Sequence, residues 1–408
     1  MRNPWSGLRG LPAPVWTIAI TTLVNRAGTM VLPFLVLYLT RHLGVPASLA
    51  GLALTAYGLG GIISAPLAGR LVDRVGAFAV MRASLAFSGV MLLVLPFAHD
   101  FRVVLLLVLC WAVVGEANRP ASLSALTHGV STSQRKAAVA VNRLAINLGM
   151  SIGPAIGGFL AVVSFPLLFV VDGVTAIAAS AVLTILLASH VAVVDGTAGV
   201  TDSLPRPRAA ARSAWQDRRA RPLFIGMTLL GLVFFQHEAA MSLYIVRDLH
   251  FRESFYGILF AVNTLLIVAI EVPLNLAMSR WPHRRAVMVG ALLFAVGFGA
   301  LALATTASAI IATIVIWTFG EMILFPVSAA YVADVAPPGR SGAYMGAYSM
   351  TISIAMVIGP WLGAAALERF GPVVMWSGVF VVGMAAVAAF GAVPRDTSDT
   401  VDAAVLAA

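Results

Sequence analysis

A series of long apolar segments, separated by short polar ones, constrains this chain most. Twelve segments could cross a lipid bilayer as helices, at about 14–40, 47–70, 78–98, 102–126, 137–163, 166–190, 222–247, 254–279, 286–305, 308–333, 341–366 and 372–393. A helix spans the hydrocarbon layer with about 20 mostly apolar residues, and its backbone groups must hydrogen-bond within it. With 60% of the 408 residues hydrophobic and 11% charged, one soluble core would not bury this apolar surface. The sequence therefore predicts an all-α integral membrane protein.

Basic residues predict how the chain is oriented. Cytoplasmic loops retain Arg and Lys, so the side with fewer basic residues is the outer one. A cytoplasmic N-terminus leaves five basic residues in the outer loops, namely Arg41, Arg102, Arg247, Arg252 and Arg369. Both termini are therefore predicted to lie in the cytoplasm, and the protein is predicted to lie in the cytoplasmic (inner) membrane of a bacterial-type cell.

The net charge of +9 follows from this topology, so no nucleic-acid partner is predicted. The polar stretch 191–221 is interpreted as a cytoplasmic linker beside anionic membrane lipid. It contains the largest arginine cluster, formed by Arg206, Arg208, Arg212, Arg218, Arg219 and Arg221.

The sequence contains an internal repeat with an offset of 206 residues, the separation between Arg41 and Arg247. Other coinciding pairs are Tyr38 and Tyr244, Arg74 and Arg280, Pro120 and Pro326, and Pro154 and Pro360. The repeat predicts a six-helix half over 1–190, the linker over 191–221, and a second six-helix half with a short cytoplasmic tail over 222–408. Parallel repeats of this kind are typical of secondary transporters, whose substrate site lies between the halves near the bilayer midplane.

The loop between the second and third predicted helices contains a glycine, three residues, an aspartate, a basic residue, any residue and a glycine. These are Gly69, Asp73, Arg74 and Gly76. The pattern resembles the signature loop of the major facilitator superfamily, in which the aspartate caps a helix end and pairs with charges of the other half. The resemblance implies a cytoplasmic gate. The aspartate is expected near a helix N-terminus, where it faces a partial positive charge. In the second half, Ser279 stands at the aspartate's position.

The fifth predicted helix contains a glycine and proline motif, formed by Gly149, Gly153, Pro154, Gly157 and Gly158. Glycines four residues apart give a helix a flat face for close packing, and proline bends it. The motif resembles one that marks the exporters of the drug/proton antiporter families, so the resemblance implies export. A simple packing face is the alternative interpretation.

Ionisable residues in the predicted spans are functional candidates, because each costs at least ~2.5 kcal/mol at the bilayer centre. Helices 1, 4, 7 and 10 line the cavity in the superfamily, and they hold Arg26, Glu116, Arg119, Glu238 and Glu321. Glu116 and Arg119 are three residues apart, which predicts one helix face and an ion pair. Glu238 and Glu321 are the predicted proton carriers or cation ligands.

Two neighbouring residues are assigned lesser roles. His237 adjoins Glu238 but points about 100° away on an α-helix, so it is not predicted to be its partner. Asp172, near the outer end of the sixth predicted helix, is predicted to be structural.

Together these features predict a monomeric transporter that exports small lipophilic or cationic compounds in exchange for protons by a rocker-switch mechanism. The alternative is a transporter of amino acids, peptides or organic anions, with Arg26 or Arg119 on the substrate carboxylate. The sequence has no zinc-binding or phosphate-binding motif and one cysteine, Cys110. No enzymatic activity, cofactor or metal is therefore predicted.

Overall fold

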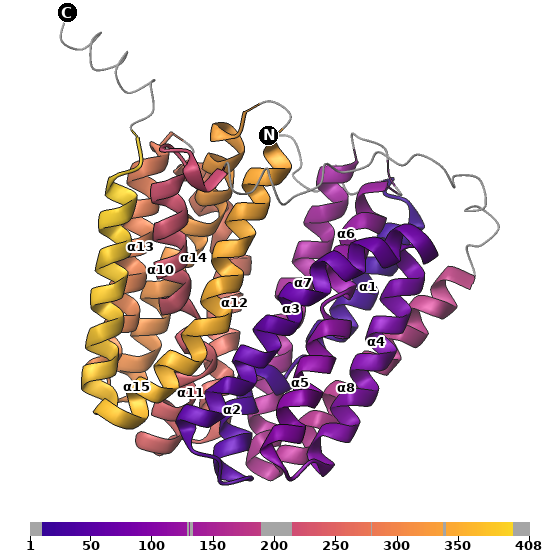
Figure 1. Ribbon diagram of the computed structural model, residues 1–408, viewed down its shortest axis with the longest axis horizontal. Coiled ribbons are helices and arrows are strands. Elements are labelled where there is room, and N and C mark those ends of the chain that lie inside the picture. The colour runs from indigo at the N-terminus through magenta and orange to yellow at the C-terminus, as the bar shows by residue number, and fades with distance from the viewer. Residues whose placement is uncertain are drawn as a thin grey trace, which may run out of the picture. The chain divides into compact units, whose positions relative to one another are not determined.

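The computed structural model describes residues 10–128, 130, 134–188, 214–278, 280–337 and 340–394 (Figure 1). Within this part of the chain, eleven helical stretches are long and apolar enough to cross a membrane. The last of them, α15 (Ser341–Gly391), has 51 residues and contains two of the predicted spans. Its backbone leaves helical geometry at Gly371, where φ is 77°, a left-handed conformation that glycine adopts without strain. The prediction of an all-α membrane protein with twelve spans is confirmed.

The chain forms two compact units. Unit 1 comprises Met1–Asp202 with Ile245–Leu265, and unit 2 comprises Ser203–Tyr244 with Leu266–Ala408. The grouping differs from the predicted halves because 245–265 packs with the first of them. A Cβ atom added to Gly257 would lie 2.4 Å from the carbonyl oxygen of Pro154, so the backbones meet there.

In unit 1, the first predicted span is two helices. The helices of this unit are α1 (Ala13–Gly28), α2 (Val31–Arg41), α3 (Ala47–Val75), α4 (Ala77–Val94) with η2 (Leu95–Phe97), α5 (Phe101–Gly115), α6 (Asn118–His128), α7 (Arg135–Val163) and α8 (Phe165–Ala188). They are joined by the start of α12 (Glu253–Ala277).

The interruption between α1 and α2 is held by a buried carboxylate from another helix. The first N–H groups of a helix have no partner within it, and inside a membrane no water replaces that partner. Here the N–H groups of Met30 and Val31 both donate to Oδ2 of Asp172 on α8, each at 3.0 Å. Asp172 is 4% exposed. The structural role predicted for Asp172 is therefore that of a cap at the start of α2, the second part of the interrupted span.

Unit 2 contains an even more irregular first span. Its elements are α10 (Arg221–Phe234), the 3₁₀ segment η4 (Phe235–Glu238), α11 (Ala240–Ser242), the first two residues of the π-helical segment η5 (Leu243–Asp248), the rest of α12, α13 (His283–Gly299), η6 (Ala300–Ala302), α14 (Ala307–Val335) and α15. In Figure 1, α13 and α14 lie side by side, and α10 packs mainly against α15. Small residues permit this packing, as is usual between membrane helices. A Cβ atom on Gly231 of α10 would lie 2.5 Å from Cβ of Ala355 of α15.

The end of the predicted linker is packed on unit 2. The hydroxyl of Tyr344 donates to Asp217 at 2.7 Å, and the hydroxyl of Tyr331 donates to the carbonyl oxygen of Arg219 at 2.9 Å. Ala214 and Ala220 are fully buried. The segment 214–220 therefore belongs to the fold rather than to a free connection. The linker residues 191–213 lie outside the described residues, and with them Arg206, Arg208 and Arg212.

Candidate functional site

Glu238 lies in a part of unit 2 where the chain is not an α-helix. In the 3₁₀ segment η4, Nδ1 of His237 donates to the carbonyl oxygen of Phe234 at 2.6 Å. That bond leaves Nε2 of the neutral ring as an acceptor, and Nε2 lies 3.7 Å from Oε1 of Glu238. The expectation that His237 is not a partner of Glu238 was wrong, because it assumed α-helical geometry. The contact is attractive when the imidazole carries a proton, and at 3.7 Å it is longer than a hydrogen bond.

Aromatic rings from three helices surround this turn. We call Phe234, Phe294, Phe298, Trp317 and Phe325 the aromatic cluster. Phe234 lies 6.0 Å from Phe294, 6.2 Å from Trp317 and 5.7 Å from Phe325, measured between ring centroids. The ring of His237 also reaches Trp317, at 6.3 Å.

Glu321 lies on the side of α14 that bears this cluster. Trp317, Glu321 and Phe325 are spaced four residues apart, so they share one face of the helix. Trp317 and Phe325 both contact Phe234 of α10 and Phe294 of α13, so the face that carries Glu321 is the one that bears the cluster. Glu238 thus adjoins the aromatic cluster through the ring of His237, and Glu321 lies on the face of α14 that carries two rings of the cluster.

In unit 1, the predicted pair of Glu116 and Arg119 does not form. The helix α5 ends at Gly115 and α6 begins at Asn118, so the three-residue spacing does not place the two side chains on one helical face. Among the described residues, no ion pair joins Glu116 to Arg119, which is exposed. Instead, the hydroxyl of Tyr57 on α3 donates to Oε1 of Glu116 at 2.6 Å. The ring of Tyr57 in turn packs on that of Trp111, with centroids 4.9 Å apart.

The glycines of α7 pack on the interruption of the first span. A Cβ atom on Gly149 would lie 2.4 Å from Cβ of Arg26, and one on Gly153 would lie 2.6 Å from the carbonyl oxygen of Thr29. The half-buried Arg26 is therefore one of the residues at which α1 meets α7.

The other two glycines of the motif face α2 and α12. A Cβ atom on Gly157 would lie 2.7 Å from Cβ of Met30, and one on Gly158 would lie 2.7 Å from the carbonyl oxygen of Glu253. Pro154 lies between the two pairs, and its own carbonyl oxygen faces Gly257. The packing-face interpretation of the motif agrees with this geometry. Its relation to export stays a prediction.

The copy of the motif in α15 holds the interrupted span of unit 2. Nε2 of Gln236 donates to the carbonyl oxygens of Leu232 and Gly359, at 2.7 and 2.8 Å. A Cβ atom on Gly363 would lie 1.5 Å from Oε1 of Gln236, so only glycine fits there. The repeat aligns Gln236 with Met30. Both halves therefore break their first span at the same position.

A model of one family, described as the Major Facilitator Superfamily, matches residues 18–247 and 238–403. The chain belongs to this superfamily. It is 26% identical over 365 residues to the uncharacterized transporter YqjV of Bacillus subtilis, covering 87% of each chain. It is also 21% identical over 376 residues to a "Na(+), Li(+), K(+)/H(+) antiporter" of Planococcus maritimus, covering 83% of this chain and 85% of that one.

Similarity to a third relative is local. The chain is 30% identical over 159 residues to the quinolone resistance protein NorA of Staphylococcus aureus, which is 39% of this chain and 40% of NorA. Among solved structures, a POT family transporter in complex with 5-aminolevulinic acid superposes with a TM-score of 0.75 at 17% identity, covering 94% of this chain and 96% of that one. This likeness concerns the fold.

The superfamily's signature loop lies at the end of α3 in this member. Asp73 and Arg74 are exposed in the last turn of the helix, and Gly76 ends it with φ of 85°. Asp73 is thus at a helix C-terminus, where the dipole repels a carboxylate, and not at the expected N-terminus. Gly69 has no atom within 4 Å of an added Cβ. Within the described residues Asp73 has no ion pair or hydrogen bond, so a latch formed with the other half stays a prediction.

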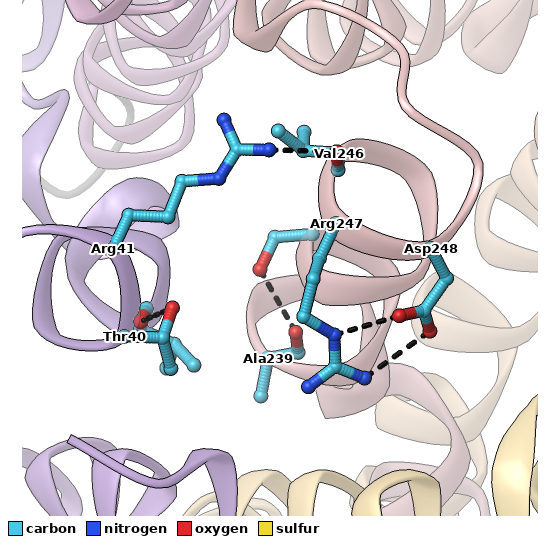
Figure 2. A network of polar contacts seen from close by, with 8 residues as sticks. Thr40, Arg41, Ala239, Val246, Arg247 and Asp248 are labelled. Atoms are coloured by element: carbon cyan, nitrogen blue, oxygen red, sulfur yellow. Dashed lines mark hydrogen bonds and ion pairs between the residues drawn. The ribbon is translucent and has the colours of Figure 1, made fainter. Parts of the chain in front are cut away.

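Sequence reasoning missed a pair of charges at the far end of unit 1. Figure 2 shows Arg41, the last residue of α2, reaching the chain before α12. Its Nη2 donates to the carbonyl oxygen of Val246 at 2.9 Å, and its Nη1 pairs with the carboxylate of Glu253, whose side chain is 11% exposed. The repeat equivalent, Arg247, binds Asp248 at 2.6 and 3.2 Å (Figure 2). The coincidence of the two arginines in the repeat is the sequence signal for this contact.

Proposed function

We propose that this superfamily member is a secondary active transporter that exports small lipophilic or cationic compounds in exchange for protons. The observation that carries the proposal is the convergence of two carboxylates, Glu238 and Glu321, on the aromatic cluster of unit 2. The partly exposed rings of the cluster, Phe234 and Phe325, can pack against flat lipophilic molecules and attract cations to their faces, with the buried Phe294, Phe298 and Trp317 behind them. A carboxylate beside them adds the negative charge that favours a cationic guest.

The same carboxylates provide the exchange. An ionised carboxylate about 5 Å from a cation stabilises it by about 3 kcal/mol at an effective dielectric constant of 20. Protonation of Glu238 or of Glu321 removes that attraction, so a proton entering from outside favours release of the substrate. Deprotonation toward the cytoplasm restores it. Alternating access by a rocker-switch motion then couples the two fluxes in opposite directions.

Two relatives support this direction. One bears the name of a cation/proton antiporter, and the other that of a resistance protein. Their names concern those proteins, and the proposal extends the chemistry to this chain. Asp73 and Arg74 would hold the cytoplasmic end shut while the proton enters, and the protein would lie in the cytoplasmic membrane with both termini inside.

Ethidium accumulation in pump-deficient bacteria tests the proposal. We would compare the wild type with Glu238→Gln, Glu321→Gln and Asp73→Asn, at equal expression and with or without a protonophore. The matched control is Glu368→Gln, which makes the same change at an exposed glutamate near the end of the eleventh span. We expect the wild type and the control to lower dye accumulation only without the protonophore, and the two glutamate variants to lose this effect.

Equal dye accumulation in all strains would refute drug export for this class of substrate. Competition by amino acids or peptides would then favour the alternative substrates, and Arg26 and Arg119 would be the next residues to replace. If Glu238→Gln and Glu321→Gln still export the dye, export would be supported, but the proposed role of these carboxylates in proton coupling would be refuted.

A further inference from the structure

Unit 2 has a groove away from the aromatic cluster, between the beginning of α13 and the end of α15. Its volume is about 400 Å³. The rim is basic and the walls are apolar, with Arg284 and Arg285 at the rim and Met288, Val289, Leu292 and Val387 along the walls. The residues of α13 recur at three- and four-residue intervals, so they form one face of that helix.

The groove exists because α13 and α15 separate toward this end. Farther along, a Cβ atom on Gly383 would lie 2.7 Å from Cβ of Ala295, and one on Gly299 would lie 2.7 Å from Cβ of Phe380. Near the groove, a Cβ atom on Gly391 would meet its nearest neighbour, Cε of Met288, only at 3.8 Å. The helices are thus in close contact at one end and apart at the other.

The rim has an excess of positive charge. The first turn of α13 contains no acidic residue, and the N–H groups of a helix N-terminus add a partial positive charge. His283 lies 3.6 Å from Asp334, but within the part of the chain that the structure describes neither Arg284 nor Arg285 has an ion pair. Two adjacent arginines at this end of a helix are unfavourable on their own. An anion placed against them would remove the repulsion.

The surroundings show what kind of anion fits. The guanidinium of Arg285 stacks on the ring of Trp281, with Cζ 4.5 Å from the ring centroid, and tryptophan is enriched where membrane meets water. From Arg285 to Leu292 the helix rises about 10 Å, so the apolar wall runs from the interface into the hydrocarbon. A soluble anion would use the rim and leave this wall empty.

We propose that the groove binds an anionic phospholipid. Its phosphate lies against Arg284, Arg285 and the first N–H groups of α13, and one acyl chain follows Met288, Leu292 and Val387. Basic residues beside apolar helix faces at the cytoplasmic surface bind lipid headgroups in this way. The predicted topology places this end of α13 in the cytoplasmic leaflet. The proposal does not depend on the transported substrate.

Native mass spectrometry of the purified full-length protein tests the lipid site. The probes are phosphatidylglycerol, which is anionic, and phosphatidylcholine, which is zwitterionic and has the same acyl chains. The test variant is Arg284→Gln with Arg285→Gln. The matched control is Arg252→Gln with Arg369→Gln, which also removes two exposed arginines, one of them stacked on Phe370 at 5.6 Å.

We expect the wild type and the control to bind phosphatidylglycerol more tightly than phosphatidylcholine. The test variant should bind phosphatidylglycerol about 25-fold more weakly, from about 1 kcal/mol for each arginine near an anionic surface. A second variant, Met288→Trp, fills the wall without changing charge and should weaken binding as well.

Three results would overturn the proposal. The first is equal affinity for the two lipids in the wild type. The second is unchanged binding of phosphatidylglycerol by both variants. The third is displacement of the lipid by soluble glycerol phosphate at a concentration similar to that of the lipid, which would identify a site for a free phosphate rather than for a lipid.

Discussion

Replacement of Asp172 by alanine should destabilise the protein more than loss of an ordinary helix cap. The substitution leaves the N–H groups of Met30 and Val31 without an acceptor in a dry environment. Both bonds are 3.0 Å long in the structure. An unsatisfied buried donor costs about 1–3 kcal/mol, so the two together predict a loss of about 2–6 kcal/mol in the free energy of unfolding.

Two further variants separate the contribution of the two hydrogen bonds from that of the charge, and a buried cap from an exposed one. Asp172→Asn keeps one oxygen that can accept both bonds and loses the charge near a helix N-terminus, so it should cost about 1 kcal/mol. Asp100→Ala removes an exposed cap that accepts one bond, from the N–H of Arg102 at 2.7 Å, and should cost about 0.5–2 kcal/mol. The contrast between two buried donors and one exposed donor gives the expected order.

The assay is reversible unfolding of the purified full-length protein in mixed micelles, titrated with a denaturing detergent. Equal losses for Asp172→Ala and Asp172→Asn would refute the hydrogen-bonding explanation. A loss below 1 kcal/mol for the alanine variant would show that the interruption of the first span does not need its cap.

Other contacts predict further effects. In a double-mutant cycle on unfolding, Arg41→Ala and Glu253→Gln should show a coupling of about 1–3 kcal/mol, because the pair is partly buried, and additive losses would contradict this. Gly257→Leu should abolish transport at unchanged expression, since an added Cβ would meet a carbonyl oxygen at 2.4 Å, and a fully active variant would show that the backbones can separate. Burial acts to raise the pKa of Asp217, but hydrogen bonds from a backbone N–H and from the Tyr344 hydroxyl hold this pKa below its usual range. Ionised Asp217 should therefore stabilise the fold above its unfolded-state pKa of about 3.9, and this contribution should be lost as the pH falls below that value. The thermal stability of Asp217→Asn should fall short of that of the wild type at pH 7 and approach it near pH 3. A difference that does not change with pH would argue against ionisation as the cause.

Hydropathy was enough to predict the spans, because membrane insertion is decided by the composition of each segment. The superfamily was indicated by the resemblance of the loop from Gly69 to Gly76 to the superfamily's signature. The interruptions of the spans were missed. The first interruption is capped by Asp172, which is 142 residues away from Met30, so no local sequence pattern indicates it. The failed pair of Glu116 and Arg119 has a related cause, since spacing places two side chains on one face only where the helix continues.

The candidate site was predicted in part. Carboxylates in apolar spans were recognisable one by one, and the structure brings Glu238 and Glu321 to one aromatic cluster. The approach of His237 to Glu238 depended on a 3₁₀ turn that no sequence pattern marked. Likewise, Arg41 and Glu253 are separated by 212 residues, and only the folded chain brings them together.

The two interruptions also have a consequence for how the halves diverged after duplication. Asp172 corresponds to Gly378 in the repeat, so the second half has a glycine where the first half has its capping carboxylate. Gln236, which stands where the first half has Met30, serves the opposite kind of backbone group: its Nε2 donates to two carbonyl oxygens, whereas Asp172 accepts from two N–H groups. Divergence therefore preserved the position of the break but neither the side chain nor the kind of hydrogen bond that holds it.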